Sequence, residues 1–396
     1  MRTILKEQTV LVAMSGGVDS SVAAYLMKEQ GYNVIGVTMK LYDDIKEDST
    51  SNRQGCCTID DIEDARRVCN MLNIPHYVFN IQKEFKDNVI NYFTSEYQNG
   101  KTPHPCIECN DKIKFSFLRK RAQILGAKFI VTGHYARIIK KKGQFYLHKA
   151  LSKNKDQTYA LYKMTQEQLS TTLMPVGWHE KDEIRNLANH LAFPNAAKPD
   201  SQDICFIPSG NYHDFISKYK LKNQGNIVDI KTGKVLGKHN GIEYFTIGQR
   251  KGLGIESNKP KYVIKINPKT KEILIGNKTD LQSTIIWANK VNYISGTPPQ
   301  SNKVTVKTRY TSNEMKGSLF FYDNGNIKVK LDATGTSITP GQAIVFYQGD
   351  QLIGGAQIIE NPTNPQYNFP SNIQKEFLFN GKTTTTINAS PSNIRN

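Results

Sequence analysis

The chain has 396 residues, 38% of them hydrophobic and 10% aromatic, and a formal net charge of +17. This hydrophobic content excludes a wholly disordered chain, and the length predicts two or three domains. No apolar run approaches the ~18–20 residues of a membrane helix, and residues 1–8 hold no long apolar stretch like a secretory signal. We therefore expect a cytoplasmic protein without a membrane partner. Its positive charge favours nucleic acid as a ligand, or serves solubility alone.

A glycine- and serine-rich stretch, Ala13-Met-Ser-Gly-Gly-Val-Asp-Ser20, follows the first predicted strand, Thr9–Met14, and precedes a predicted helix at Ser21–Met27. Gly16 and Gly17 let the backbone approach a ligand closely, and the N–H groups at a helix start favour an anion. The stretch lacks the lysine of a Walker loop and the spacing of a dinucleotide fingerprint. It resembles the pyrophosphate loop of enzymes that split ATP between its α- and β-phosphates and put AMP on a substrate. The alternative is a Gly-rich turn with no ligand.

Strand and helix patterns alternate over the first third of the chain, which predicts an α/β domain with a parallel sheet and helices on both faces. Ligands on such sheets bind at the C-terminal ends of the strands. Ser15–Ser20, Met39 and Gly133–Tyr135 all fall at such ends, so we expect them to meet in one crevice. Cys69 lies on the apolar face of a helix and is expected in the core. The predicted strands are Asn33–Met39, His76–Asn80 and Lys128–Thr132, and the predicted helices are about Ile59–Leu72, Gln82–Gln98 and Ile113–Leu125.

The rest of the chain is richer in strand patterns. A hairpin is predicted at Arg137–Ala150, and we expect a small β-rich middle domain at 210–284 after an N-terminal domain at 1–209. Short strands with regular turns at 285–360 predict a barrel, and the Asn-, Pro-, Ser- and Thr-rich tail at 361–396 is predicted to be disordered. The other predicted elements are helices at about Gln166–Leu173, Lys181–His190 and Asn211–Tyr219, and strands at Tyr262–Ile266, Glu272–Gly276, Lys303–Lys307, Ile327–Leu331, Ala343–Tyr347 and Gly355–Ile359.

Six cysteines occur, and the expected reducing compartment argues against structural disulfides and for redox, sulfur or metal chemistry. Cys106-Ile-Glu-Cys109 is predicted to lie in a loop between two helices, after the prolines of Thr102–Pro105. Three interpretations of this motif compete. It could be half of a zinc site completed by His104 or His134, or a thioredoxin-like redox motif. It could also be a pair of sulfur-handling cysteines beside an adenylating site. The cysteines are Cys56, Cys57, Cys69, Cys106, Cys109 and Cys205.

The order of these motifs resembles the tRNA-specific 2-thiouridylase family, whose members replace O2 of the wobble uridine with sulfur. The resemblance extends from about Val10 to Ile359 and covers all three predicted domains. The motifs that carry it are Met14–Ser20, Met39-Lys40, Thr102–Asn110, Ile113-Lys-Phe115, Thr132–Tyr135, Asn154–Gln157, Asp200–Pro208, Thr246–Gly254, Arg309-Tyr310 and Pro340–Gln342.

The resemblance implies an adenine nucleotide α-hydrolase-like pyrophosphate-loop domain, a small β-rich central domain and a C-terminal β-barrel that binds tRNA. It also implies ATP and Mg2+, with Asp19 as a candidate metal ligand or a residue of the helix start. The implied partners are wobble-uridine tRNAs, such as those for Lys, Glu and Gln, and a sulfur donor, such as a cysteine desulfurase or a persulfide carrier. The implied ATP-binding residues are Ala13, Met14, Ser15, Gly16, Gly17, Val18, Asp19, Ser20, Met39 and Gly133, and the implied tRNA-binding residues are His134, Lys155, Asp156, Gln157, Arg309, Tyr310 and Gln342.

The implied catalytic residues are Cys109, Cys205 and Cys106, and the target base is placed near His104, Pro105 and Cys106. Many family members have Asn-Pro-Asp at these last three positions, and His104 could partly replace the missing Asp. The sequence is similar to the C-x-x-C variant of the family, which implies a [4Fe–4S] cluster held by Cys106, Cys109 and Cys205. The alternative is a persulfide on Cys205, released by Cys109 with formation of a disulfide between the two. Both sulfur routes stay open.

Two rival functions remain. One is another ATP-pyrophosphatase enzyme that adenylates a substrate, such as an amidotransferase-type synthetase or a 4-thiouridine enzyme. The other is a non-catalytic RNA-binding protein with a degenerate loop. The clustered cysteines and the β-rich C-terminal region argue against an amidotransferase-type synthetase, and a 4-thiouridine enzyme would normally carry added RNA-binding or sulfur-transfer modules. Intact Ser15, Asp19 and Ser20 argue against the non-catalytic RNA-binding protein.

Overall fold

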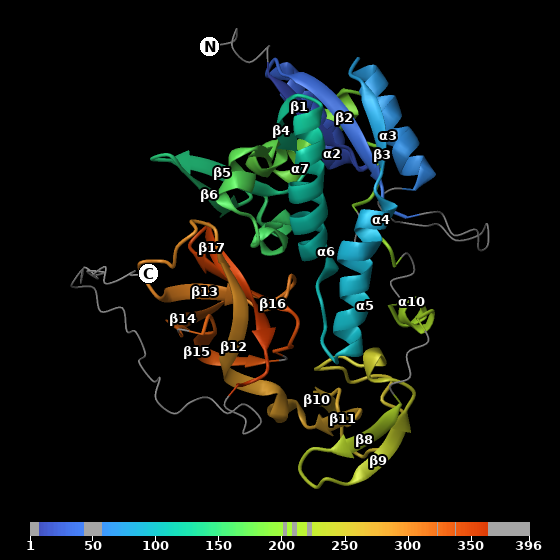
Figure 1. Cartoon of the computed structure of the whole chain (residues 1–396), viewed down its shortest axis with the longest axis vertical. Coiled ribbons are helices and arrows are strands. Elements are labelled where there is room, and N and C mark those ends of the chain that lie inside the picture. The colour runs from blue at the N-terminus through green and yellow to red at the C-terminus, as the bar shows by residue number, and fades with distance from the viewer. Residues whose placement is uncertain are drawn as a thin grey trace, which may run out of the picture.

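The computed structural model describes residues 8–42, 58–200, 204–207, 212–219, 224–322, 324–336 and 338–362. Cys56, Cys57 and the predicted disordered tail from 363 onwards lie outside the described residues. Figure 1 shows an α/β layer at the top, a barrel at the lower left and a small sheet at the bottom. The helices α5 (Asn91–Gln98) and α6 (Pro105–Glu108) run between these parts.

The N-terminal sheet is parallel throughout, as predicted. Its strand order is β3-β2-β1-β4-β7. Val10 and Val12 face one hydrophobic core, and Leu11 between them faces another, so both faces of the sheet are covered. The strands are β1 (Thr9–Ala13), β2 (Asn33–Lys40), β3 (His76–Asn80), β4 (Ala127–Val131) and β7 (Thr172–Leu173), the last of which was not predicted.

One face of this sheet carries the core that includes Cys69, which is fully buried. This burial confirms the prediction of a core residue, and it raises the pKa of the Cys69 thiol to about 12. The helices on this face are α2 (Val18–Glu29), α3 (Ile59–Met71) and α9 (Lys181–His190). The other face carries α4 (Gln82–Phe85), a π-helix (Lys86–Ile90) and α5 in one run, and α6, a π-helix (Cys109–Phe117) and α7 (Leu118–Ile124) in another.

The prediction that Cys106 and Cys109 lie in a loop is wrong. Cys106 is in α6, and Cys109 is the first residue of the following π-helix. Pro105 occupies the start of α6, where its fixed φ suits a helix and its missing N–H costs no hydrogen bond. The helix therefore begins at Pro105 and places both cysteines on a rigid element. The π-helix that begins at Cys109 spans nine residues, and π-helical segments within helices are frequent at functional sites.

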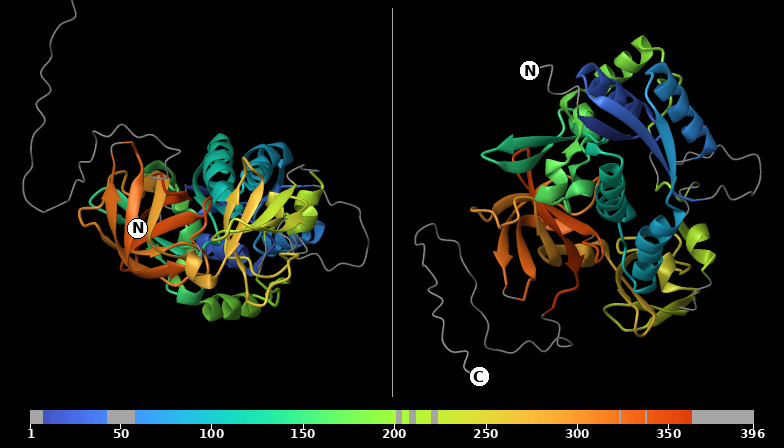
Figure 2. Two further views of the ribbon diagram at one scale, coloured as in Figure 1. Left: turned by 90° about the horizontal axis from the view of Figure 1, so that it is seen from below. Right: turned by 45° about the horizontal axis from the view of Figure 1, so that its top comes forward.

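The predicted hairpin consists of β5 (Ala136–Lys141) and β6 (Gln144–Lys149), and its turn has positive φ at Lys142 and Gly143. β6 also pairs with the last strand of the barrel through Leu147 opposite Leu352. The hairpin thus extends the barrel sheet although it belongs to the N-terminal part of the chain, and it lies beside the barrel in both views of Figure 2. The other elements of this region are α8 (Gln166–Ser170) and 3-10 helices at Lys153–Lys155, Thr158–Leu161 and Pro175–Trp178.

Six antiparallel strands form the predicted C-terminal barrel, in the order β12-β15-β14-β13-β16-β17, and pairing of β12 with β17 closes it. A third core, which includes Tyr159 and Tyr347, packs the barrel against the N-terminal part. The strands are β12 (Gln282–Tyr293), β13 (Lys303–Lys307), β14 (Met315–Phe321), β15 (Ile327–Thr336), β16 (Ala343–Gln348) and β17 (Gln351–Ile359).

The middle part holds a four-stranded sheet of order β10-β11-β8-β9 with its own core. No helix among the described residues is long and apolar enough to span a membrane. The domain boundaries near 209 and 284 stay a prediction. The middle elements are α10 (Tyr212–Ser217), β8 (Gly225–Asp229), β9 (Val235–His239), a 3-10 helix (Ile242–Tyr244), β10 (Tyr262–Asn267), β11 (Glu272–Gly276) and a 3-10 helix (Lys278–Leu281).

Candidate active site

The loop between β1 and α2 has the backbone geometry of an anion site. Gly16 has a φ of 74°, and a Cβ there would lie 2.5 Å from the carbonyl oxygen of Asp61, so only glycine fits. A Cβ on Gly17 would meet only the Ser15 Oγ, at 3.4 Å, which leaves open space above this backbone. No side chain caps α2, which begins at Val18. Its first N–H groups are therefore available to a phosphate.

Hydroxyl groups fix the shape of this loop. The Ser15 N–H donates to the Ser20 Oγ at 3.2 Å, and the Ser20 Oγ donates to the Gly17 carbonyl at 2.9 Å. The buried Asn195 amide donates to the Gly16 carbonyl and to the Ser21 Oγ, each at 2.9 Å. Asn195 was not predicted from the sequence, because nothing local marks a residue 179 positions away from Gly16. The loop is thus held in place before any ligand arrives.

The end of β4 lies against this loop. A Cβ on Gly133 would lie 2.8 Å from the Asp19 carbonyl carbon and from the Ser20 nitrogen. The Tyr135 hydroxyl donates to Asp19 Oδ1 at 2.8 Å. Met39, at the end of β2, is buried in the core on the helix-α5 side of the sheet. Gly133 and Tyr135 thus contact the loop directly, and the ATP role implied for Met39 stays a prediction.

Lys181 is a cation beside the loop that the sequence did not reveal. Its Nζ lies 2.7 Å from Asp19 Oδ1 and 2.9 Å from Asp19 Oδ2, and 2.8 Å from Asp200 Oδ1. Its side chain is only 9% exposed. The sequence does not single it out, because a lysine at the start of an amphipathic helix is common.

Asp200 is the meeting point of three cations. Lys155 Nζ lies 2.7 Å from its Oδ2, and Arg185 Nη2 and Lys181 Nζ lie 2.7 and 2.8 Å from its Oδ1. Burial by itself would raise the pKa of Asp200, but hydrogen bonds from Lys155 and Lys181 outweigh it and lower the pKa to about 2. Asp200 is therefore ionised throughout the physiological pH range.

The three predicted sulfur residues occupy different environments. Cys109 is 8% exposed and belongs to the core that also contains Phe206, and the half-buried Cys205 packs against this core. Cys106 is exposed. The Tyr42 hydroxyl donates to the Cys205 carbonyl at 2.7 Å. Cys109 and Cys205 thus share one core, although they lie 96 positions apart in the sequence.

The described residues do not form a metal site in this arrangement. They contain no group of three or more His, Cys, Asp or Glu side chains placed to hold a metal ion. The [4Fe–4S] cluster and the zinc site therefore do not fit the side chains as they lie. Cys69, Cys106, Cys109 and Cys205 are all reduced, so the predicted disulfide is not supported in the described part of the chain.

His104 lies at the start of α6 with its ring 5.6 Å from that of Tyr159. Its Nδ1 is buried and finds no hydrogen-bond partner in the described part of the chain. Burial lowers the pKa of His104 to about 4, so the imidazole is neutral at physiological pH. The ring is thus a weak base, and its buried Nδ1 offers a hydrogen bond to a ligand. The following Pro105 is buried.

Two of the predicted tRNA contacts are engaged inside the protein. Asp156 accepts hydrogen bonds from the Ala150 N–H at 3.1 Å and the Thr158 Oγ1 at 2.6 Å, and burial raises its pKa. His134 is 9% exposed and lies 2.8 Å from the Thr132 Oγ1. Burial lowers the pKa of His134 well below its usual value. Asp156 and His134 thus have partners within the protein, and their implied RNA contacts stay a prediction.

Gln157 is also engaged inside the protein. Its Oε1 accepts a hydrogen bond from the Tyr135 N–H at 2.9 Å. Gln157 therefore fixes the backbone of the strand end that contacts the loop.

The barrel residues of the predicted interface are placed in different ways. The Arg309 guanidinium donates to the Thr339 Oγ1 at 3.0 Å and to the Ile247 carbonyl at 3.4 Å, so it bridges the barrel and the middle part. Tyr310 is 39% exposed, with its ring 6.2 Å from that of Tyr159 and close to Cys106. Tyr310 is therefore the aromatic ring of this set that is open to a base.

Gln342 holds the segment that precedes the two cysteines. Its Nε2 donates to the Thr102 carbonyl at 3.0 Å, and the Thr102 N–H donates to the Pro340 carbonyl at 3.0 Å. A Cβ on Gly341 would lie 2.8 Å from the Lys101 Cβ. Two hydrogen bonds thus join Thr102 to the barrel. This contact was not predicted, because no local pattern links these distant segments.

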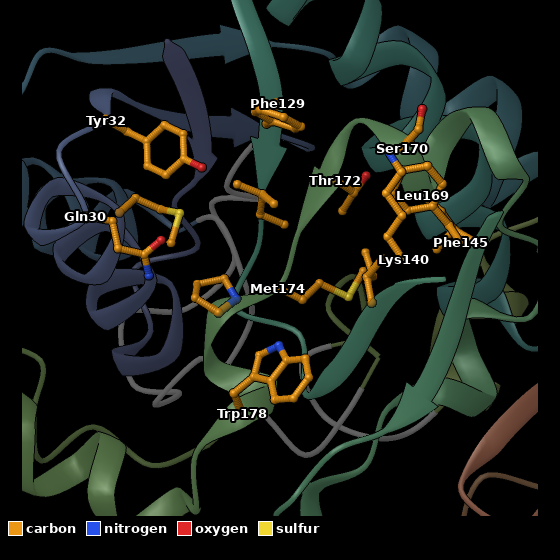
Figure 3. A pocket seen from close by; sticks show the side chains of 14 residues that line it. Gln30, Tyr32, Phe129, Lys140, Phe145, Leu169, Ser170, Thr172, Met174 and Trp178 are labelled. Carbon is orange, nitrogen blue, oxygen red and sulfur yellow. The ribbon is translucent and has the colours of Figure 1, made fainter. Parts of the chain in front are cut away.

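A cavity of about 260 Å3 lies at the other end of α2 from the loop. Trp178, Met174 and Phe129 surround it (Figure 3). It contains none of the predicted site residues. The cavity is therefore separate from the loop between β1 and α2.

Three family models match consecutive parts of the chain. They are described as a tRNA methyl transferase HUP domain, matching residues 8–209, a tRNA methyl transferase PRC-barrel domain, matching 213–277, and an aminomethyltransferase beta-barrel domain, matching 283–358. The match order agrees with an α/β domain, a middle domain and a barrel.

Curated proteins match almost the whole chain. The tRNA-specific 2-thiouridylase MnmA of Clostridium kluyveri is 50% identical over 357 residues, which cover 88% of this chain and 98% of that protein. The protein of the same name from Lachnoclostridium phytofermentans is 47% identical over 355 residues, which cover 89% and 99%. The domain models carry the word methyl transferase, whereas these near full-length relatives are named for thiolation. The cysteines and the loop agree with thiolation and not with methyl transfer.

Proposed function

The chain belongs to the tRNA-specific 2-thiouridylase family, whose reaction is ATP-dependent 2-thiolation of tRNA uridine, and from this premise we propose that it thiolates the wobble uridine and takes the sulfur from a cysteine persulfide. The observation that carries the proposal is one α/β domain that holds both an uncapped pyrophosphate loop and the Cys109–Cys205 pair in one core. The loop suits an adenylating step, and the thiols suit a sulfur transfer.

The first step activates the uridine oxygen. ATP would lie with its phosphates on the N–H groups of the first turn of α2 and on the hydroxyls of Ser15 and Ser20. The uridine O2 attacks the α-phosphorus, the bond to the bridging oxygen breaks, and pyrophosphate leaves. The N–H and hydroxyl donors of the loop would stabilise the charge on the leaving group. Mg2+ bound to the phosphates, with Asp19 as the nearby carboxylate, would neutralise further charge.

The second step exchanges oxygen for sulfur. The terminal sulfur of a persulfide on Cys205 attacks C2, and AMP leaves with the former O2. The thiolate of Cys109 then attacks the Cys205 sulfur, which breaks the sulfur–sulfur bond to the base and leaves 2-thiouridine and a Cys109–Cys205 disulfide. An external dithiol must reduce this disulfide before the next turnover. No step is assigned to an iron–sulfur cluster, because the described side chains do not gather its ligands.

The target base must leave the anticodon stack to reach this site. We propose that it stacks near the exposed ring of Tyr310 and that the neutral His104 handles the uridine proton. Cys106 then lines the base site, because it is exposed and close to Tyr310. We also propose that the substrates are the tRNAs for Lys, Glu and Gln and that a desulfurase or a persulfide carrier donates the sulfur. The proposed location is the cytoplasm.

The test is a thiolation assay. The protein is incubated with Mg2+, ATP, unmodified tRNA and a persulfide donor, and nucleosides are analysed by mass spectrometry while AMP and pyrophosphate are counted. We expect one AMP and one pyrophosphate for each 2-thiouridine at the wobble position. Iron is counted in protein purified without oxygen. Stoichiometric iron together with activity only in its presence would replace the persulfide route by the cluster route, and absence of 2-thiouridine would refute the function.

A further inference from the structure

Four charged side chains form a line of alternating sign through the site. Lys155 contacts Asp200 at 2.7 Å, Asp200 contacts Lys181 at 2.8 Å, and Lys181 contacts Asp19 at 2.7 Å. We call these four residues the charge line. They come from a 3-10 helix, the segment before Cys205, the start of α9 and the first turn of α2.

The two ends of the charge line are open and its middle is enclosed. The side chain of Lys155 is 37% exposed and that of Asp19 is 28% exposed, whereas Asp200 is 18% and Lys181 is 9% exposed. Charge interactions are screened least where water is excluded. A change in charge at one end of the line therefore alters the ion pairs up to the other end, because water and salt screen these contacts poorly.

Surrounding groups keep the middle of the charge line in place. Arg185 donates to Asp200 and also to the carbonyls of Ala196 and Lys198, so the Asp200 carboxylate cannot easily leave. The Tyr135 hydroxyl donates to Asp19, and the Lys181 ammonium lies 5.5 Å from the Tyr135 ring centre. With both carboxylates held by these neighbours, the Lys181 ammonium can shift by small amounts between Asp19 and Asp200.

The ends of the charge line face the two substrates of the proposed function, on which this inference rests. Asp19 belongs to the loop for the phosphates and Mg2+ of ATP, and Lys155 is an expected contact for a tRNA phosphate. One end thus offers a carboxylate to a cation, and the other offers an ammonium to an anion. Binding of either ligand would shift Lys181 in the same direction, away from Asp19 and toward Asp200.

We propose that Lys181 and Asp200 are positioning residues through which ATP and tRNA binding favour each other. A tRNA phosphate at Lys155 draws that ammonium from Asp200, so Asp200 attracts Lys181 more strongly and Asp19 is released to the metal. Conversely, Mg2+ and ATP at Asp19 release Lys181 to Asp200 and free Lys155 for the phosphate. The coupling is reciprocal, as equilibrium requires. It would favour the complex that holds both substrates before adenylation begins.

The test measures binding without turnover. The probe is α,β-methylene-ATP with Mg2+, which cannot be split between the α- and β-phosphates, and its Kd is measured by calorimetry with and without saturating unmodified tRNA. For the wild type we expect tRNA to lower this Kd about 5-fold to 100-fold, the usual range of such coupling. For Lys181→Met we expect the ratio of the two Kd values to fall close to one, even though each ligand still binds.

Lys261→Met is the matched control. Lys261, next to β10, pairs with Asp229 of β8 at 2.8 Å with its side chain 20% exposed, and it lies outside the charge line. The variant should keep the wild-type ratio. A role of Lys181 in stability alone would lower the melting temperature and leave the ratio unchanged, and that result would overturn the inference.

A second pair of variants covers the case that Lys181→Met does not fold. Lys155→Gln changes the exposed end of the charge line, and Lys307→Gln removes a neighbouring lysine beside Tyr310. We expect both to weaken tRNA binding but only Lys155→Gln to reduce the Kd ratio. Equal ratios in the two variants would overturn the inference. If the wild type binds both ligands with a ratio of one, the inference fails and the proposed function stands; if it binds neither, the proposed function fails as well.

Discussion

At the nucleotide end of the site, Ser15, Gly17 and Ser20 hydrogen-bond one another within a single loop. At the sulfur end, by contrast, Thr102 before the cysteine helix is held by Gln342 of the barrel, 240 positions away. Cys109 and Cys205 also come from distant segments. The first end is built by local hydrogen bonds on a sheet edge, and the second is assembled by the packing of separate parts. Loss of a barrel contact should therefore affect sulfur transfer and leave nucleotide binding intact.

The largest expected effect separates the two ends completely. Cys109→Ser should lower the thiolation rate by about 10³-fold or more, because the thiolate that releases the sulfur is lost. Binding of α,β-methylene-ATP should stay within about twofold, since the phosphate donors expected in the loop are the first N–H groups of α2 and the hydroxyls of Ser15 and Ser20, which the substitution does not change. The rate is measured by mass spectrometry and the binding by calorimetry. Cys69→Ala, at a buried cysteine of the opposite core, should keep the thiolation rate; a Cys109→Ser protein that thiolates normally would disprove the assigned role.

Gly16→Ala should disrupt the nucleotide end alone. The left-handed φ and the contact with the Asp61 carbonyl should together cost about 3 kcal/mol of unfolding free energy. Gly126→Ala is the control, because Gly126 has a similar φ of 71° but no atom within 4 Å of its Cβ position. That variant should cost about 1 kcal/mol. Denaturant unfolding measures both, and equal losses would contradict the tight packing of the loop on α3.

A pH titration of stability tests the burial of His104 at the sulfur end. Its pKa is about 4 in the folded chain and ordinary when unfolded, so between pH 6.5 and 4 the unfolded state binds more protons. Stability from this residue is therefore complete above pH 6.5 and is lost as pH falls. Relative to His104→Gln, the wild type should lose about 2–3 kcal/mol over this range. His134 is present in both proteins, so its contribution cancels. Parallel stability curves would mean that His104 titrates normally.

The smallest effect concerns the barrel contact. Gln342→Ala removes the hydrogen bond to the Thr102 carbonyl, which is worth about 1 kcal/mol, and should slow thiolation several-fold, by roughly the factor that this energy corresponds to. The Kd of α,β-methylene-ATP should not change. Gln357→Ala is the matched control, because Gln357 also reaches from the barrel but contacts Glu96 on α5. If the two variants thiolate at equal rates, the hydrogen bond from Gln342 to Thr102 does not contribute to sulfur transfer.

Much of the nucleotide end was predictable because its information is local. The glycines and serines of the loop, the flanking strand and helix, and Gly133 at the next strand end follow from short patterns. Lys181 and Asn195 escaped prediction because their contacts with the loop exist only after folding. Neither residue type nor spacing marks them in the chain.

The sulfur end was harder to predict for a physical reason. The two prolines around His104 indicated a loop, but Pro105 starts a helix and so places Cys106 and Cys109 on it. The family resemblance identified the cysteines, yet it could not say whether their side chains converge. In the described residues they do not form a metal site. The strands β8, β9, β12 and β14 were missed as well.

The central claim is that the uridine oxygen is activated by adenylation and removed as part of AMP. The direct measurement uses tRNA with an 18O label at O2 of the wobble uridine, in a reaction with ATP and a persulfide donor. Mass spectrometry of the products should find the 18O in AMP, one label for each 2-thiouridine formed. Recovery of the 18O in phosphate or pyrophosphate, with unlabelled AMP, would contradict the account.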